Sequence, residues 1–200
     1  MLPVQPTDQL TSSSFIRHIA VFGSFWGLAE ITLGTFLHLF HFPLAGLVLS
    51  QVAVLILLNA ARIRYRSGSI IIMGLVAMLI KGIALSTIKL GPMVGILLES
   101  LTVELMFRRT LPGRGSFMIT GMLVSILPII QTLVVKMIYM GFTFIEYLVD
   151  FIQYLSTLFP FAAGWYLVLL YLMIHLTTGL LTGWLAWRLS EDIRLHRKAS

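Results

Sequence analysis

Long runs of apolar residues, separated by short polar connections, dominate this sequence. A run of about 18 or more apolar residues is long enough to cross the hydrocarbon core of a bilayer as one helix. The pattern therefore predicts six membrane-spanning helices, at residues 15–40, 43–61, 69–88, 92–107, 117–140 and 162–187. The fold class that we expect is all-α: a compact bundle of six transmembrane helices. This bundle forms a single domain, 15–187, between a polar tail at 1–14 and a basic tail at 188–200.

The composition agrees with a membrane protein rather than a soluble one. Hydrophobic residues make up 58% of the 200 residues and charged residues 11%, which excludes an ordinary soluble domain. Because the chain has no cysteine, disulfide frameworks, thiolate metal sites and cysteine nucleophiles are excluded as well. The polar start of the chain lacks the charged region of a signal peptide, so we expect the first apolar run to remain as a span.

Basic residues mark every second connection between the predicted spans. They follow the second, fourth and sixth spans and flank the start of the first: Arg62, Arg64 and Arg66; Arg108, Arg109 and Arg114; Arg188, Arg194, Arg197 and Lys198; Arg17 and His18. The positive-inside rule places such clusters in the cytoplasm, so we expect both termini on the cytoplasmic side of the cell (inner) membrane. The same clustering accounts for the net charge of +6, and no nucleic-acid partner is expected.

A row of small and ionisable residues runs along one face of the first span. Helical geometry aligns Gly23, Gly27, Glu30, Gly34, His38 and His41 within one narrow arc. Small residues let a neighbouring helix approach closely, so this face is expected to point into the protein. Lys81 lies on a similar face of the third span, and both Glu30 and Lys81 lie about 20 Å from the cytoplasmic end at 1.5 Å per residue. We therefore predict a structural ion pair between Glu30 and Lys81, and a functional role for this face stays open.

Two neighbouring apolar spans carry Lys81 and Glu99 within them. An ionisable group at bilayer depth costs at least ~2.5–3.5 kcal/mol on insertion scales, so it usually faces a partner, a cavity or a ligand. Glu99 ends a row that begins with Gly91 and Gly95, and it has no assigned partner. It is therefore the acid for which we expect a functional role.

Other polar residues of the spans have less specific interpretations. Glu104 lies four residues before Arg108 and is interpreted as a boundary residue paired with it. His175 falls near mid-membrane, and it is either a hydrogen-bonded core histidine or a group that binds ligand or relays protons. Pro128 is expected to kink the fifth span and to free backbone groups near Gln131.

The outer connection at 141–161 is long and rich in aromatic residues. Glu146 and Asp150 are four residues apart, so one helical turn would place both acids on the same side. The segment is either an interfacial aromatic belt or a lid over a pocket. Lys136, towards the outer end of the fifth span, either snorkels to the interface or reaches a ligand.

Several chemistries lack their sequence motifs. The chain contains no GxSxG, HExxH or P-loop, so a protease is not expected and any ATP-driven process would need another subunit. His38 and His41 lack a clear third ligand, so neither a metal site nor a cofactor is expected.

Three segments together resemble a known family: GLAEITLGTFLH, FPLAGLVLS and GLVAMLIKGIALSTIKLGPMVGILLESLTVEL. They are similar to the substrate-binding S components of energy-coupling factor (ECF) transporters, and the resemblance covers most of the chain. It implies a compact six-helix bundle without catalytic chemistry of its own, which captures a vitamin or related micronutrient near the outer face. It also implies two kinds of partner, a transmembrane coupling subunit and cytoplasmic ATPases.

The resemblance also implies roles for particular residues. The pocket of the family lies near the outer ends of the later helices, which by position points to Lys89, Glu99, Gln131, Lys136, Glu146, Asp150, Trp165, Tyr166 and His175. Family members dock on the coupling subunit through small residues of the first helix, here Ala20, Gly23 and Gly27. The family pattern is commonly alanine, whereas this chain has mostly glycine.

Two other functions stay open at the level of sequence. One is a small proton-coupled carrier, in which Glu30, Lys81 and Glu99 relay charge. The other is a membrane-embedded enzyme or assembly factor that uses Glu99 and His175 as acid and base. The enzyme requires both titrating groups in one cavity, and the carrier requires a polar path open to both faces.

Overall fold

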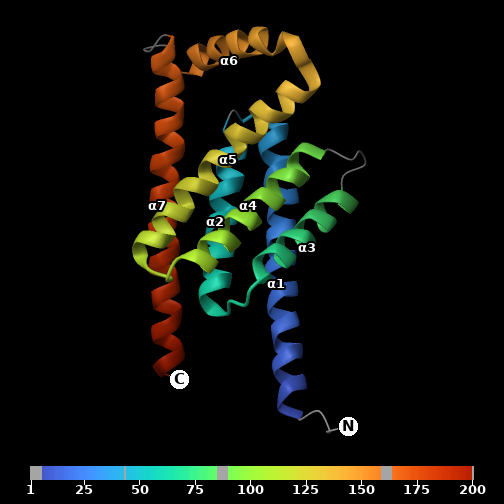
Figure 1. Ribbon diagram of the computed structural model, residues 1–200, viewed down its shortest axis with the longest axis vertical. Coiled ribbons are helices and arrows are strands. Elements are labelled where there is room, and N and C mark those ends of the chain that lie inside the picture. Colours follow the sequence, from blue (N-terminus) through green and yellow to red (C-terminus); the bar gives the residue numbers. More distant parts are fainter. Residues whose placement is uncertain (1–5, 43, 85–89, 159–163, 200) are drawn as a thin grey trace.

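All regular structure in the computed structural model is helical within the residues it describes, which are 6–42, 44–84, 90–158 and 164–199. In chain order the elements are α1 (Pro6–Leu39), α2 (Ala45–Ile63), α3 (Ser69–Ala84), α4 (Leu90–Arg109), α5 (Arg114–Met140), the 3-10 helix η1 (Gly141–Thr143), α6 (Phe144–Leu158) and α7 (Trp165–Ala199) (Figure 1). The expected all-α fold class is therefore confirmed.

The predicted spans correspond to α1–α5 and α7, and the differences lie at the ends and in one connection. Helix α1 begins at Pro6, within the segment expected as a polar tail, and α7 continues to Ala199 through the expected basic tail. Once a helix has formed, each further residue adds a backbone hydrogen bond, so both helices continue past their apolar segments. The outer connection at 141–161 contains a further helix, α6.

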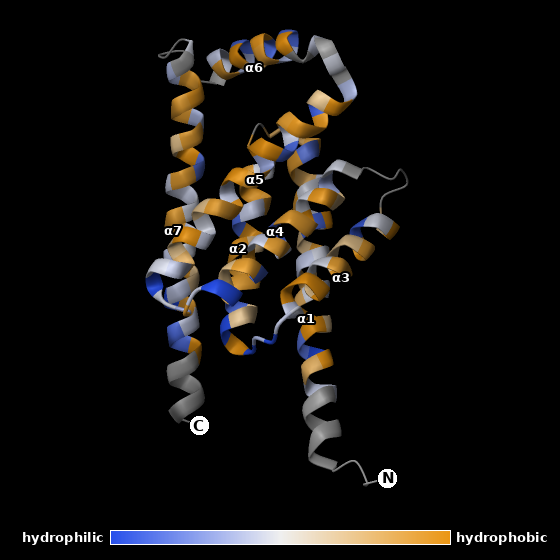
Figure 2. Ribbon diagram, in the orientation of Figure 1, coloured by the Kyte–Doolittle hydropathy of each residue, from blue (hydrophilic) through white to orange (hydrophobic). Residues whose placement is uncertain are grey.

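Length and apolar surface identify a multi-pass membrane protein. Within the described ranges, four helical segments are long and apolar enough to cross a membrane: Ser13–Leu39, Ala45–Ile63, Arg114–Tyr139 and Tyr166–Ile193. Helix α3 is apolar but has only 16 residues, about 24 Å, which is shorter than the ~30 Å hydrocarbon core. Large apolar side chains are exposed on most helices, as expected for contact with lipid. Hydrophobic residues recur along all of the long helices (Figure 2).

The two longest helices, α1 and α7, run along the long axis on opposite sides of the molecule (Figure 1). Helix α3 packs on α1 and α5 packs on α7, while α2 contacts both of the long helices. The chain begins and ends at the same end of the molecule, and α6 crosses between α5 and α7 at the other end (Figure 1).

The glycine face of α1 packs against α3. A Cβ atom on Gly23 would lie 2.9 Å from Val76 Cβ, and one on Gly27 would lie 3.1 Å from Ala77 Cα. Both glycines are buried, so they let two helices of this chain approach closely and are not open to another subunit. Of the three residues expected to dock on a coupling subunit, Gly23 and Gly27 are therefore covered by α3, whereas Ala20 is exposed.

The basic clusters come together at the end of the molecule that holds both termini. Arg62 of α2 pairs with Glu191 of α7 at 2.8 Å and donates to the carbonyl oxygen of Pro112 in the α4–α5 connection. The Arg62 guanidinium also lies 4.6 Å from the ring centre of Trp187. These contacts fix the ends of α2, α4 and α7 side by side.

Glu104 is fully buried near this end of the bundle, and its carboxylate has a complete set of donors. It accepts hydrogen bonds from the backbone N–H groups of Gly68 (2.6 Å), which directly precedes α3, and of Ile70 (3.1 Å) in its first turn. Tyr65 and Arg108 donate to the same carboxylate, each at 2.9 Å. The predicted Glu104–Arg108 pair is confirmed, and the carboxylate in addition caps α3. Burial, followed by the hydrogen bond to Glu104, raises the pKa of the Tyr65 phenol.

Candidate functional site

A cavity of about 690 Å³ lies between α1, α2, α3, α4 and α5. Its polar lining consists of Glu30, Thr35, His38, Lys81, Glu99 and Gln131. Apolar side chains complete the wall, among them Ile31, Leu49, Ile96 and Pro128. The volume lies within the range of about 300–1,000 Å³ that is typical of small-molecule sites.

The mouth of the cavity lies at the end of the molecule away from the termini. The exposed lining residues Thr35, His38 and Leu39 belong to the end of α1, and exposed Gly46 belongs to the start of α2. Glu30 lies nine residues before the end of α1 at Leu39, which is about 14 Å further in at 1.5 Å per residue. The charged residues therefore lie at the bottom of the cavity and not at its mouth.

The ion pair between Glu30 and Lys81 lies in this cavity. The Lys81 Nζ atom is 2.5 Å from Glu30 Oε2, and both side chains are buried. This is the pair that the helical spacing and equal depth predicted. The two residues also line the cavity, which gives the pair access to any bound molecule and goes beyond the structural role expected of it.

Glu99 approaches the same pair from α4. Its side chain is buried, with 6% of its surface exposed, and it lies close enough to Glu30 and Lys81 to interact electrostatically with both. Among the described residues, no donor forms a hydrogen bond or contact ion pair with its carboxyl group. A buried carboxyl group without a donor is costly, and a molecule bound in the cavity that it lines would supply the donor.

Gln131 closes the wall of the cavity between α4 and α5. Its Nε2 group donates to the carbonyl oxygen of Gly91, and its Cδ atom would lie 3.1 Å from a Cβ atom on Gly95. The glycine row on α4 therefore makes room for the Gln131 side chain. One turn earlier on α5, Pro128 lies against Gly46 of α2 in the same wall. The sequence singled out both Gln131 and Glu99 as candidate ligand-binding residues.

His175 belongs to a different part of the bundle. Its Nδ1–H donates to the carbonyl oxygen of Ser125 at 2.5 Å, and the Ser125 hydroxyl donates to the His175 carbonyl oxygen at 2.6 Å. The imidazole is fully buried between α5 and α7 and does not line the cavity. The hydrogen-bonded core histidine is therefore the interpretation that the structure favours.

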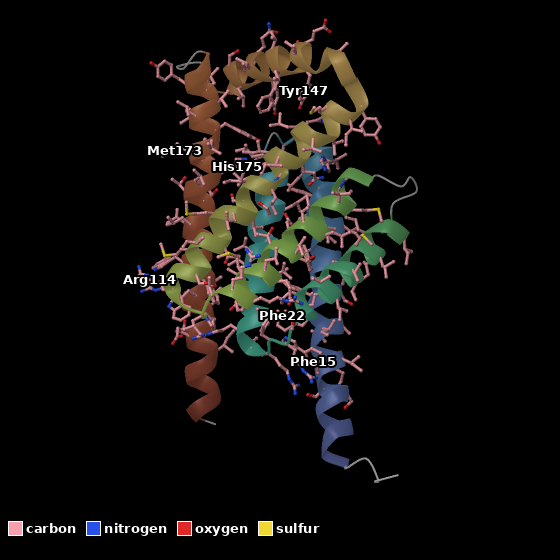
Figure 3. All side chains as sticks on the ribbon, in the orientation of Figure 1. Phe15, Phe22, Arg114, Tyr147, Met173 and His175 are labelled. Atoms are coloured by element: carbon pink, nitrogen blue, oxygen red, sulfur yellow. The ribbon has the colours of Figure 1, made fainter. Side chains whose placement is uncertain are left out.

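The remaining candidates lie around α6, away from the cavity lining. Tyr147 and Phe151 stack on the inner face of α6, Phe151 contacts Tyr171 of α7, and the Lys136 Nζ atom lies 5.2 Å from the ring centre of Tyr147. Figure 3 shows Tyr147 on α6 and His175 on α7 in the same half of the molecule. The acids Glu146 and Asp150 are exposed.

These contacts favour an interfacial helix over a lid. Helix α6 packs on α5 and α7, and its exposed face carries the acids Glu146 and Asp150 beside apolar Ile145 and Val149, a mixture that suits a helix lying at a membrane surface. Tyr166 is 77% exposed and does not line the cavity. Lys89 and the side chain of Trp165 lie outside the described residues.

Two polar residues of the cavity lining were not among the residues expected to bind substrate. Thr35 and His38 line the cavity near its mouth, and only His38 was noted, as part of the α1 row. Their position on α1 at i, i+3 from each other was the available signal. In the described part of the chain, no group of three His, Asp or Glu side chains is placed to hold a metal ion.

No protein-family model, no curated protein and no solved structure matches the chain.

Proposed function

We propose that this chain is the substrate-capture subunit of an ATP-driven importer of the ECF type, which binds a vitamin or related micronutrient in the cavity. The observation that carries the proposal is the cavity itself: it is of small-molecule size, open at one end, and built from polar and charged side chains of four helices inside an apolar bundle. The protein has no catalytic step in this proposal. A coupling subunit and cytoplasmic ATPases supply the energy.

The proposal includes a topology of six membrane crossings, by α1–α5 and α7, with both termini in the cytoplasm of a cell (inner) membrane. The gathering of the basic clusters at the end that holds the termini supports this orientation, because such clusters stay on the cytoplasmic side. The mouth of the cavity would then face outwards, which is the side from which an importer collects its substrate.

Docking on the coupling subunit needs a surface other than the glycine face of α1, because α3 covers that face. The outward side of α1 is the alternative that the structure offers. It presents Ala20 together with the exposed side chains of Val21, Phe25 and Leu28.

A proton-coupled carrier is the second candidate. The observation in its favour is that Glu30, Lys81 and Glu99, which were expected to relay charge, lie together in one cavity. The enzyme that would use Glu99 and His175 as acid and base has no such support, because His175 does not line the cavity that holds Glu99.

Affinity purification from native membranes, followed by uptake measurements in reconstituted vesicles, tests the proposal. We expect a coupling subunit and ATPases to co-purify with the chain, and substrate uptake to require ATP. Uptake by the chain alone in vesicles without ATP, driven by a proton gradient, would instead establish the carrier.

A further inference from the structure

We propose that the cavity binds a small organic cation, whose positively charged nitrogen pairs with the carboxyl group of Glu99. This inference rests on the proposed substrate-capture function and names the chemical class of the substrate. It follows from the charges at the bottom of the cavity, from the position of Glu99 and from the apolar remainder of the wall.

The charged residues of the cavity do not balance. The two carboxyl groups of Glu30 and Glu99 outnumber the single ammonium group of Lys81. The Lys81 ammonium is already engaged by Glu30 at 2.5 Å. A bound anion would therefore face two carboxyl groups and a cation that has a partner, whereas a bound cation would complete the set.

Glu99 is the group that this cation would meet. Its side chain is 94% buried and lines the cavity, and none of the described residues donates a hydrogen bond to it. The nearest titratable side chain at the mouth, His38, is exposed and lies near the end of α1. An ammonium or iminium group of a ligand would supply the missing donor in a region of low dielectric, where such a contact is strong.

The rest of the cavity indicates an organic cation and not a metal ion. A hard metal ion requires several oxygen or nitrogen ligands, and in the described residues no group of three acidic or imidazole side chains is placed to provide them. Ile31, Leu49 and Ile96 line the wall above Glu99, and they suit an apolar or aromatic body of a ligand. Gln131 adds a neutral polar group that can orient this body.

The test compares three probes of one shape and different charge, tryptamine, tryptophol and indole-3-acetate, by calorimetry on the full chain in lipid nanodiscs. They share an indole ring and end in an ammonium, a hydroxyl or a carboxylate group. We expect tryptamine to bind at least tenfold more tightly than the other two. We expect Glu99→Gln to reduce this preference to less than threefold, whereas Glu99→Asp and the exposed control Glu146→Gln keep it.

Several outcomes would overturn the inference. Equal binding of the three probes, tighter binding of indole-3-acetate, absence of binding by all three, or a preference for tryptamine that survives in Glu99→Gln would each do so. The wild-type comparison needs no variant, so a misfolded Glu99→Gln protein leaves the inference testable. If the chain co-purifies with a coupling subunit and ATPases but shows no preference for tryptamine, the cationic substrate is refuted and the importer function is not. If it prefers tryptamine but has no such partners, the importer function is refuted and the cationic substrate is not.

Discussion

Two glutamates of α4, five residues apart, have opposite environments. Glu104 accepts four hydrogen bonds, from Tyr65, Gly68, Ile70 and Arg108. Glu99 accepts none from the described residues and lines the cavity. A buried carboxylate with all of its donors stabilises the fold, whereas one without donors destabilises it unless a ligand supplies them. The same residue type therefore serves structure at one position and is available for binding at the other.

The Glu30–Lys81 pair predicts strong coupling between two substitutions. Removal of one partner leaves the other buried charge without its contact ion pair, so Glu30→Gln or Lys81→Met should each lower the free energy of unfolding by about 3–5 kcal/mol. The double variant, without either charge, should lose less than the sum of the two. Equilibrium unfolding in mixed micelles measures all four proteins. Strictly additive losses would show that the two side chains do not interact in the membrane.

Substitution of Glu104 should lower the stability of the fold and leave binding in the cavity unchanged. Glu104→Gln places an amide N–H group against four donors, so we expect the free energy of unfolding to fall by about 1.5–3 kcal/mol, the usual value for hydrogen bonds to a charged group. Thermal unfolding in detergent measures this loss. The exposed acid Glu146 gives the matched control, and an equal melting temperature for Glu104→Gln and Glu146→Gln would contradict the capping role.

At this scale the sequence predicted pairs better than it predicted the site. The spacing of Glu30 on α1 and the equal depth of Lys81 were enough for the ion pair, because a helix fixes both the face and the rise of each residue. The candidates Lys136, Glu146, Asp150 and His175 do not line the cavity. The position of a residue along its helix does not determine which residues of other helices surround it, because these neighbours depend on the packing of the whole bundle.

At the scale of elements, close helix pairs depend on positions without a side chain. Helix α5 approaches α7 so closely that a Cβ atom on Gly179 would lie 2.7 Å from Ser125 Cβ and closer still to the backbone of Gly121. The nearest atoms belong to backbone, which cannot rotate away. The sequence does not show which helix these glycines contact, because that depends on how α5 and α7 pack.

The α5–α7 contact predicts a sharp effect of one methyl group. Gly179→Ala should force the two helices apart and lower the free energy of unfolding by about 1–3 kcal/mol, the usual cost of overpacking. Gly115→Ala, where a Cβ atom would meet nothing within 4 Å, is the matched control and should leave stability nearly unchanged. The free energy of unfolding of both variants is measured in the same detergent. Equal stability of the two variants would contradict the close contact between α5 and α7.

The pattern of apolar residues did not determine how the outer connection, which contains helix α6, packs on the bundle. The outer connection was predicted to carry Glu146 and Asp150 on one side of a helical turn, and both are exposed on α6. A helix of 15 residues is too short to be recognised as a span, so the sequence alone did not predict how this segment packs. In the structure Phe151 of α6 packs on Tyr171 of α7.

At the scale of the whole molecule, the sequence predicted the all-helical class and the positions of the long helices. It did so because apolar length and basic clusters are properties of the chain that do not depend on neighbours. The cavity could not be predicted in the same way, since it is the space left where five helices diverge. Its charged lining comes from three helices, α1, α3 and α4, whose proximity is a result of folding.

The proposed topology predicts which engineered cysteines a membrane-impermeant maleimide can reach in intact cells. The chain has no cysteine, so single substitutions report without background. Thr157→Cys, on the exposed face of α6, should be labelled from outside. Ser67→Cys and Leu111→Cys, which are exposed in the connections that follow α2 and α4, should be labelled only after permeabilisation, because the basic clusters hold those connections in the cytoplasm. Labelling of Leu111→Cys in intact cells would show the opposite orientation. The mouth of the cavity would then face the cytoplasm, which contradicts capture of a substrate from outside.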